Sequence, residues 1–309
     1  MRKLWHSAWL LLAAANLFWA GNIVLGRGIA GEVPPIMLAW LRWTGAFLIA
    51  VGFAWPLLKR DAPLMLRHWK MMLLLAATGI ASYNTMAYIG LIETTALNVL
   101  LLQSATPLII IVWAFALFRE VPTLRQVAGV LLSLAGVAAI AAHGSVAVLA
   151  SLTLNPGDVW VLAALAIYAV YCVMLRKRPA VHPLSFLVAA MGIGSVMILP
   201  FMVAELVTGA RVHAGAGAWV AVAYMAVLPS FISYLFFNRG IELIGGGPAG
   251  QSMHLMPLFG SILAVVFLHE AFRMYHVVGI VLIAGGILMA SLNARPAHRN
   301  VIARSASSG

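Results

Sequence analysis

The chain alternates between long runs of apolar residues and short clusters of polar and charged ones. Cutting it wherever charges or turn-forming residues interrupt an apolar run leaves ten segments. A helix needs about 20 mostly apolar residues to cross the roughly 30 Å hydrocarbon core of a bilayer, and each segment is close to that length. The pattern therefore predicts an all-α integral membrane protein with ten transmembrane helices. Their expected limits are 8–26, 36–57, 69–90, 95–118, 124–142, 157–175, 184–208, 217–238, 246–268 and 275–292.

Composition narrows the possible functions. Hydrophobic residues make up 63% of the 309 positions and charged residues 9%, which excludes a soluble enzyme because ordinary soluble domains are about 45–50% apolar. The single cysteine, Cys172, excludes an intrachain disulfide framework and a cysteine-based metal cluster within one chain. His269 beside Glu270 lacks the spacing of metal ligands. We therefore expect no metal site and no cofactor.

The basic residues indicate how the chain is oriented. With the N-terminus placed in the cytoplasm, fifteen of the 19 Lys and Arg fall in cytoplasmic segments, three fall outside at Arg27, Arg211 and Arg273, and Arg42 lies within the second span. Both termini are therefore predicted to be cytoplasmic, following the positive-inside rule. The net charge of +11 reflects this topology, so we expect the lipid bilayer as a partner and not nucleic acid. The oligomeric state is not indicated.

The two halves of the chain resemble each other. A shift of 150 residues superposes them without a gap and places Pro107 on Pro257. Because each half has an odd number of spans, the second half must be inverted in the membrane. We therefore expect two inverted five-helix repeats around a central cavity, at 1–145 and 156–293, and a disordered cytoplasmic tail at 294–309. Reading the first segment as a cleaved signal peptide would leave nine spans and spoil this pairing.

Small residues recur on the fifth span and on its counterpart, the tenth. Gly129, Ser133 and Gly136 lie on the fifth, and Gly279 and Gly286 lie 150 residues after the two glycines. Small side chains let membrane helices approach each other closely. We expect these positions to pack helices together and not to bind a ligand.

The order of motifs in each half resembles a known family. Each half carries a mid-span proline, a helix-ending glutamate (Arg119-Glu120-Val121 and His269-Glu270-Ala271) and then a Gly-x6-Gly helix. Over nearly the whole chain this order resembles the ten-helix EamA-type members of the drug/metabolite transporter (DMT) superfamily. The runs 5–42 and 83–120 look most like the YddG-type exporters of aromatic amino acids. The resemblance implies a basket-like bundle, amino-acid efflux and residence in the bacterial cell inner membrane.

Polar side chains in the middle of spans are the candidate site. They are costly in lipid and should face partner helices or a water-filled cavity. The 150-residue shift pairs Asn84 with Tyr234 and Ser104 with His254, so two related walls should meet at similar depths. The same groups could instead hold the helices together. The predicted substrate-cavity residues are Trp19, Asn22, Tyr83, Asn84, Tyr88, Gln103, Ser104, Tyr168, Tyr171, Tyr234, Asn238, Gln251 and His254.

Two titratable side chains within the spans have more than one interpretation. Arg42 can contact a substrate carboxylate, or it can pair structurally with Glu32 or Glu93. His254 is the natural protonatable group near a midspan. A neutral histidine that is hydrogen-bonded within the bundle is the alternative.

The two prolines suggest how a cavity could open. Pro107 and Pro257 each remove a backbone donor in mid-helix and loosen it, so they are predicted hinges, with a fixed kink as the alternative. Inverted repeats are typical of secondary transporters that work by alternating access. We expect the two repeats to expose the cavity to one face at a time.

The side chains also restrict what passes through. Asp and Glu are absent near the predicted midspans and Arg42 is the clear cation there, which disfavours an obligate carrier of cationic drugs, a carboxylate proton relay and a sugar-phosphate carrier. Aromatic rings with neutral amides suit aromatic and other neutral amino acids. The expected function is amino-acid export; the alternative is a multidrug or other small-metabolite exporter of the same superfamily. An enzyme is not expected, because the loops lack room for clustered catalytic residues.

Overall fold

The computed structural model describes residues 5–94, 96–103, 105–141, 155–256, 258–260, 263 and 274–291. This part of the chain is helical and contains no β-strand. Its elements are α2 (Ala8–Gly28), α3 (Pro35–Arg67), α4 (Trp69–Ala76), η1 (Ala77–Ser82), α5 (Tyr83–Glu93), α6 (Ala96–Gln103), α7 (Thr106–Phe118), α8 (Leu124–Ala141), α10 (Pro156–Met174), η2 (Leu175–Lys177), α11 (Pro183–Val207), α12 (Ala216–Met225), η3 (Ala226–Ile232), α13 (Ser233–Ile244), α14 (Gly246–Gln251), η4 (Ser252–His254) and α16 (Met274–Ser291).

The prediction of an all-α membrane fold is confirmed within the described residues. Six helical segments are long and apolar enough to cross a bilayer, and three shorter apolar helices accompany them. The last part of the predicted ninth span, from residue 264 on, and the tail at 294–309 lie outside the described residues. The long segments are Ala8–Gly28, Pro35–Arg67, Trp69–Glu93, Pro156–Lys177, Pro183–Val207 and Ala216–Ile244.

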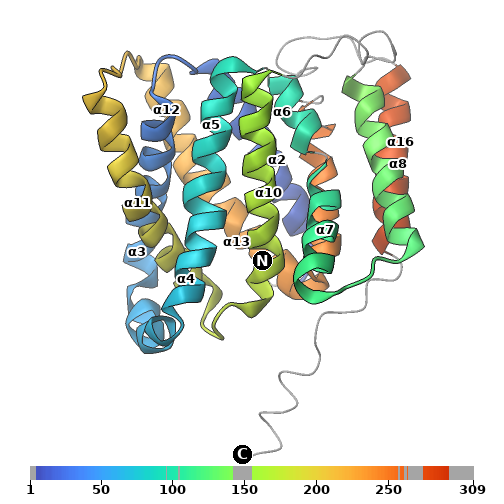
Figure 1. Cartoon of the computed structure of the whole chain (residues 1–309), viewed down its shortest axis with the longest axis horizontal. Helices are drawn as coiled ribbons and strands as arrows, with labels where there is room; N and C mark the ends of the chain where they lie inside the picture. The colour runs from blue at the N-terminus through green and yellow to red at the C-terminus, as the bar shows by residue number, and fades with distance from the viewer. Residues whose placement is uncertain are drawn as a thin grey trace, which may run out of the picture.

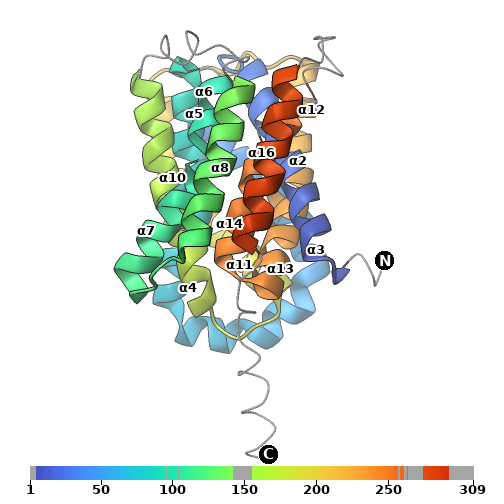
Figure 2. The ribbon, with the colours of Figure 1, turned by 90° about the vertical axis from the view of Figure 1, so that its right-hand side faces the viewer.

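The long helices stand side by side as a bundle (Figure 1). On one side of the bundle α3 packs on α11, and on the opposite side α8 packs on α16. Figure 2 shows α8 and α16 next to each other on the face that they form. Between these two sides, α2 pairs with α13 and α5 pairs with α10. The middle of the bundle is therefore built by α2, α5, α10 and α13, and the site lies there.

Helices α3 and α11 cap each other. The Glu205 carboxylate on α11 accepts hydrogen bonds from the backbone N–H groups of Ile36 and Met37, at 3.0 and 2.8 Å. The Asp61 carboxylate near the end of α3 accepts the N–H of His182, just before α11, at 2.9 Å. The first N–H groups of a helix have no partner within it, and its N-terminus favours negative charge. Each helix thereby stabilises the start of the other.

Helices α8 and α16 approach through glycine, as the sequence predicted. A Cβ added to Gly129 would lie 2.6 Å from the carbonyl oxygen of Gly286, and one added to Gly136 would lie 2.7 Å from that of Gly279. The Ser133 hydroxyl donates to the carbonyl of Ile283 at 3.3 Å. Since residue numbers rise along one helix as they fall along the other, the pair is antiparallel. The expected close packing at these small residues is confirmed.

Two of the long segments are interrupted by a π-helical turn where the sequence predicted continuous helices. Segment η1 lies between α4 and α5, and segment η3 lies between α12 and α13, about 150 residues further on. In η3, Pro229 lacks a backbone N–H, and the hydroxyl of Ser230 donates to the carbonyl of Met225, five residues earlier. Such turns occur frequently at functional sites. Their wide hydrogen-bond spacing frees backbone carbonyls in the middle of the bundle.

The predicted fourth span is two helices, not one. Helix α6 ends at Gln103 and α7 begins at Thr106, so Pro107 occupies the first turn of α7 and not the middle of a continuous helix. Proline is well tolerated in a first turn because the missing N–H has no partner there. The Gln103 carbonyl accepts the Thr106 hydroxyl at 2.6 Å. The break in the span therefore precedes the proline, and Pro257 lies outside the described residues.

Candidate functional site

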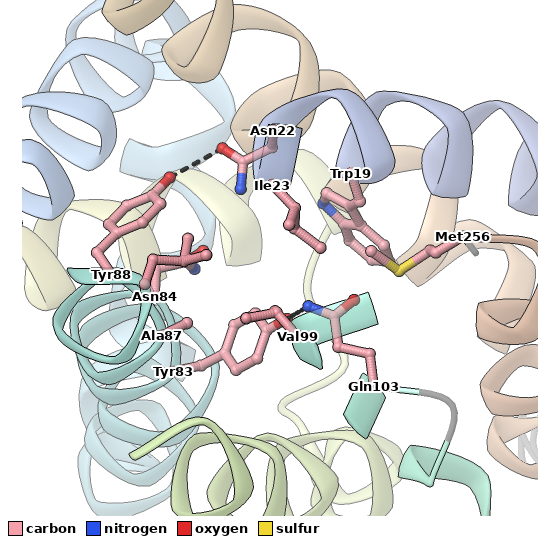
Figure 3. Close-up of a pocket in the computed structure, with 11 residues that line it drawn as sticks. Trp19, Asn22, Ile23, Tyr83, Asn84, Ala87, Tyr88, Val99, Gln103 and Met256 are labelled. Atoms are coloured by element: carbon pink, nitrogen blue, oxygen red, sulfur yellow. Dashed lines mark hydrogen bonds between the residues drawn. The ribbon is translucent and has the colours of Figure 1, made fainter. Parts of the chain in front are cut away.

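A small cavity lies in the middle of the bundle, where α2, α5 and α6 meet (Figure 3). Its volume of about 20 Å³ has room for roughly one water molecule, so the walls are nearly closed on each other in this conformation. Six of the predicted cavity residues line it, together with apolar neighbours. The lining residues are Trp19, Asn22, Ile23, Tyr83, Asn84, Ala87, Tyr88, Leu91, Val99, Gln103 and Met256.

Arg42 lies directly behind the polar wall of this cavity. Its Nη1 donates to Oδ1 of Asn22 at 3.1 Å and to Oδ1 of Asn84 at 2.6 Å. Nη1 also donates to the Tyr88 hydroxyl at 2.8 Å, and that hydroxyl donates to Oδ1 of Asn22 at 2.8 Å. The guanidinium Nε donates to the hydroxyl of Ser230 in η3. One cation therefore ties α2, α3, α5 and η3 together beside the cavity.

The expected alternative pairing of Arg42 with Glu32 or Glu93 is not formed. Among the described residues the guanidinium hydrogen-bonds to four neutral groups, and only 1% of Arg42 is exposed. Glu32 instead accepts the N–H of Gly215 at 3.4 Å. Burying a charge that has no opposite charge nearby costs several kcal/mol, even when its hydrogen bonds are satisfied. The polar wall of the cavity therefore carries an uncompensated positive charge.

Aromatic rings fill the bundle next to the cavity. The Trp19 ring lies 5.5 Å from that of Tyr234 and 5.0 Å from that of Phe237, between centroids. Tyr83 lies 4.6 Å from Tyr168. Trp43 lies 5.0 Å from Tyr234. These edge-to-face and tilted contacts are of the kind that aromatic pairs favour.

Three tyrosines that were predicted to line the cavity belong to this cluster in the present conformation. Tyr168 stacks on Tyr171 at 5.5 Å, and Tyr171 donates its hydroxyl to Oδ1 of Asn238 at 3.0 Å. Tyr234 lies 6.5 Å from Tyr168. All four side chains are at most 1% exposed. The structure thus brings Tyr168, Tyr171, Tyr234 and Asn238 together beside the cavity and not on its surface.

The two π-helical segments offer matching carbonyls to aromatic donors. The indole N–H of Trp19 donates to the Pro229 carbonyl in η3 at 2.8 Å. The Tyr234 hydroxyl donates to the Gly79 carbonyl in η1 at 2.8 Å. Gly79 and Pro229 are 150 residues apart. The freed carbonyls of both segments therefore point into the aromatic cluster.

The remaining polar residues lie on α14 and η4. His254 is fully buried, and neither ring nitrogen has a hydrogen-bond partner in the described part of the chain. The expected hydrogen-bonded histidine is therefore not seen. Oε1 of the buried Gln251 is likewise unpaired there, whereas Nδ2 of Asn16 donates to the Ser252 hydroxyl at 3.0 Å. Ser104, also predicted for the cavity, lies outside the described residues.

Several residues of the site were missed by the sequence reasoning. Ser230 anchors Arg42, and its position after Pro229 in an apolar span was a usable signal because proline frees backbone groups that a hydroxyl can satisfy. The apolar lining gives no such signal, since it is surrounded in sequence by equally apolar residues facing lipid. These residues are Ile23, Ala87, Leu91, Val99 and Met256.

Comparison with known proteins identifies the family. Residues 6–142 and 155–292 each match the EamA-like transporter family. This chain belongs to the EamA-like transporter family. It is therefore a multi-pass membrane transporter of the DMT superfamily, not an enzyme. The fold agrees with a solved crystal structure at a TM-score of 0.75 and 22% identity, covering 94% of this EamA-like transporter and 98% of that chain.

Relatives of this EamA-like transporter are named as transporters. The uncharacterized transporter YyaM of Bacillus subtilis is 28% identical, covering 92% of this chain and 93% of its own. An uncharacterized transporter of Archaeoglobus fulgidus is 27% identical, covering 91% and 96%. A probable terminal-alkyne amino-acid exporter of Streptantibioticus cattleyicolor is 28% identical, covering 93% and 94%.

Proposed function

We propose that this EamA-like transporter is a secondary-type exporter of aromatic and other neutral amino acids in the bacterial cell inner membrane. The observation that carries the proposal is the cavity itself. It is lined by aromatic rings, neutral amides and a phenol, and it is backed by the buried Arg42. A zwitterion with an apolar side chain matches these groups. The name of the Streptantibioticus cattleyicolor relative points to the same class of substrate.

The proposed mechanism is alternating access between two inverted five-helix repeats, 1–145 and 156–293. Elements that recur at a spacing of about 150 residues support it: the segments η1 and η3, and the helices α8 and α16. In secondary transporters of this kind the substrate site lies between the repeats, near the midplane. The proposed hinges are Pro107 and Pro257, and η1 and η3 offer two further points of bending.

The proposed orientation places both termini in the cytoplasm. One end of the bundle gathers basic side chains together with their carboxylate partners: Arg176 pairs with Glu120, and Arg178 with Glu242. An excess of Arg and Lys on one side supports a cytoplasmic placement of that end. Tyr168 and Tyr171 lie on α10 shortly before Arg176 in η2, so the aromatic cluster lies toward this end of the bundle.

A multidrug or other small-metabolite exporter of the same superfamily is the second proposal. The observation in its favour is the aromatic cluster around Trp19 and Tyr168, because ring faces can hold a planar or quaternary cation. The charge of Arg42 opposes it, since a second cation in the same cavity would be repelled in a medium of low dielectric constant.

Counterflow in liposomes separates the two proposals. Purified protein is reconstituted in liposomes preloaded with unlabelled Phe, Trp, Thr or a planar drug cation, and uptake of labelled Phe is followed without a proton gradient. We expect saturable uptake that is accelerated by the preloaded amino acids. If amino-acid loading gives no uptake and a labelled planar cation exchanges instead, amino-acid export is wrong and the multidrug function takes its place.

A further inference from the structure

The amides on the cavity wall have a fixed orientation. A guanidinium can only donate hydrogen bonds, so the oxygens of Asn22 and Asn84 must face Arg42. Each side-chain NH2 group is then turned away from Arg42. Nδ2 of Asn84 has no hydrogen-bond partner among the described residues, although the residue is only 3% exposed. Figure 3 shows Nδ2 of Asn22 pointing into the space between the lining side chains.

One end of the cavity is therefore a donor end. The NH2 group of Asn22 points into it, Asn84 lies in the same wall, and the positive charge of Arg42 lies directly behind both amides. Hydrogen bonds to an ionised partner are shorter and about twice as strong as neutral ones. An anionic group that met these donors would also compensate the buried charge, which has no carboxylate partner among the described residues. This end matches the carboxylate of a substrate.

The opposite end of the cavity is an acceptor end. Nε2 of Gln103 donates to the Tyr83 hydroxyl at 3.1 Å, which leaves Oε1 as the free atom of that amide. Oε1 is buried and has no hydrogen-bond partner in the described part of the chain. In Figure 3 the amide of Gln103 lies between the rings of Tyr83 and Trp19, which also line the cavity. An amide oxygen flanked by aromatic rings suits an ammonium group.

We propose that the cavity is polarised for a zwitterion: Asn22 and Asn84 bind the α-carboxylate, and Gln103 with the rings of Trp19 and Tyr83 binds the α-ammonium. Arg42 is a positioning residue, because it holds the two amides and reaches the substrate through them. This inference rests on the proposed amino-acid function and adds to it. Transport then requires a free carboxylate and a free ammonium on the same molecule. The side chain of the substrate contacts the apolar part of the lining.

The first experiment varies the substrate. Labelled Phe is exchanged by counterflow with the wild-type protein in liposomes, and unlabelled phenylalaninamide or N-acetylphenylalanine competes. The amide lacks the carboxylate and the N-acetyl compound lacks the ammonium, so each leaves buried groups unpaired. We expect each to compete roughly tenfold or more weakly than Phe. If both compete as well as Phe while Phe is exchanged, the polarised site is wrong and amino-acid transport stands.

Two matched variants then assign the two ends. Asn84→Leu keeps the approximate volume of the side chain and removes the donor NH2 group at one end of the cavity. Gln103→Met keeps the approximate volume of its side chain and removes the acceptor oxygen at the other end. We expect Asn84→Leu to lose the discrimination between Phe and phenylalaninamide while it still discriminates against N-acetylphenylalanine. Gln103→Met should show the reverse pattern. A merely structural role would weaken all three ligands alike, so equal losses in both variants would overturn the assignment.

The outcomes for function and for the site remain distinct. Absence of Phe exchange by the wild-type protein, with exchange of a planar cation, would overturn amino-acid transport and the zwitterion site with it. Exchange of Phe without the crossed pattern of Asn84→Leu and Gln103→Met would overturn the site alone. Thermal unfolding of each variant in detergent verifies that a lost exchange reflects the site and not misfolding.

Discussion

A guanidinium in the middle of a membrane bundle needs acceptors for its donors and compensation for its charge. Arg42 finds hydrogen-bond acceptors in Asn22, Asn84, Tyr88 and Ser230, but its described contacts include no carboxylate that would compensate its charge. Uncompensated charges within membranes are rare and tend to mark functional sites. The simplest physical account is that the compensating charge arrives with the substrate.

Replacing Arg42 tests this account. Arg42→Gln removes the charge but keeps hydrogen-bonding capacity, so we expect Phe counterflow to fall about tenfold or more, as for the loss of one charge-assisted hydrogen bond. Arg42→Lys keeps the charge but lacks the planar fork that holds several acceptors at once, and an intermediate loss is expected. Initial exchange rates in liposomes at matched protein content measure both. Wild-type exchange by Arg42→Gln would show that the charge is not used.

At this scale the sequence indicated which polar side chains lie in the middle of the bundle better than it predicted their partners. Arg42, Asn22, Asn84 and Tyr88 were all identified from their positions in apolar spans. Their arrangement was not predicted, because the partners of Arg42 lie between 20 and 188 residues away along the chain. Spacing along one helix carries no information on such contacts. The carboxylates proposed instead were chosen for their charge alone.

The elements most informative about function are the two π-helical segments. Pro229 in η3 was a visible signal in the sequence, since proline cannot continue a hydrogen-bond ladder. Segment η1 has no proline, and a single glycine such as Gly79 does not predict a π-helical turn. A Cβ at Gly79 would lie 2.3 Å from the Tyr171 ring, so packing against α10 accounts for the glycine. Helical periodicity alone predicts continuous helices in both places, and tertiary contacts decide otherwise.

A pair of tryptophans tests the role of the freed carbonyls. Trp19 donates its indole N–H to Pro229, whereas the buried indole N–H of Trp43 has no partner among the described residues. Both side chains are buried and lose the same volume on replacement by Phe. We expect Trp19→Phe to lower the free energy of unfolding by about 1–3 kcal/mol more than Trp43→Phe, because it leaves a buried carbonyl unpaired.

Thermal unfolding in a single detergent measures this difference between Trp19→Phe and Trp43→Phe. Equal losses in the two variants would mean that the Pro229 carbonyl finds another donor, and the π-helical segment would then not depend on the aromatic cluster.

At the scale of the whole molecule, the sequence predicted the limits of several membrane helices. Predicted limits such as 8–26 and 184–208 agree within about two residues with α2 and α11, because charged clusters mark the ends of apolar runs. The 150-residue spacing also reappears in η1 and η3 and in the pair α8 and α16. The aromatic cluster was not predicted, because the sequence indicates which rings lie deep in the bundle but not which rings touch.

The contact between α8 and α16 joins the two halves of the chain, and two adjacent glycines test it. A Cβ at Gly286 would lie 2.2 Å from the Ser133 hydroxyl and 2.4 Å from the Gly129 carbonyl, whereas one at Gly285 would meet its nearest neighbour, Leu132, at 3.8 Å. We expect Gly286→Ala to lower the free energy of unfolding by about 1–3 kcal/mol, the usual cost of overpacking. Gly285→Ala should be neutral or slightly stabilising.

The melting temperatures of the two variants in one detergent decide this prediction. A Gly286→Ala protein as stable as Gly285→Ala would show that the two helices can separate without cost.

The same contact has a consequence for the origin of the chain. Gly129 on α8 faces Gly286 on α16, and Gly136 faces Gly279, so both helices present the same pair of glycines to each other. A surface with that property is complementary to itself and can form an isologous dimer across a two-fold axis. A shorter ancestral protein with a single such helix could pair with an oppositely inserted copy of itself. Joining two genes for such helices would turn that encounter, which depends on concentration, into an intramolecular one.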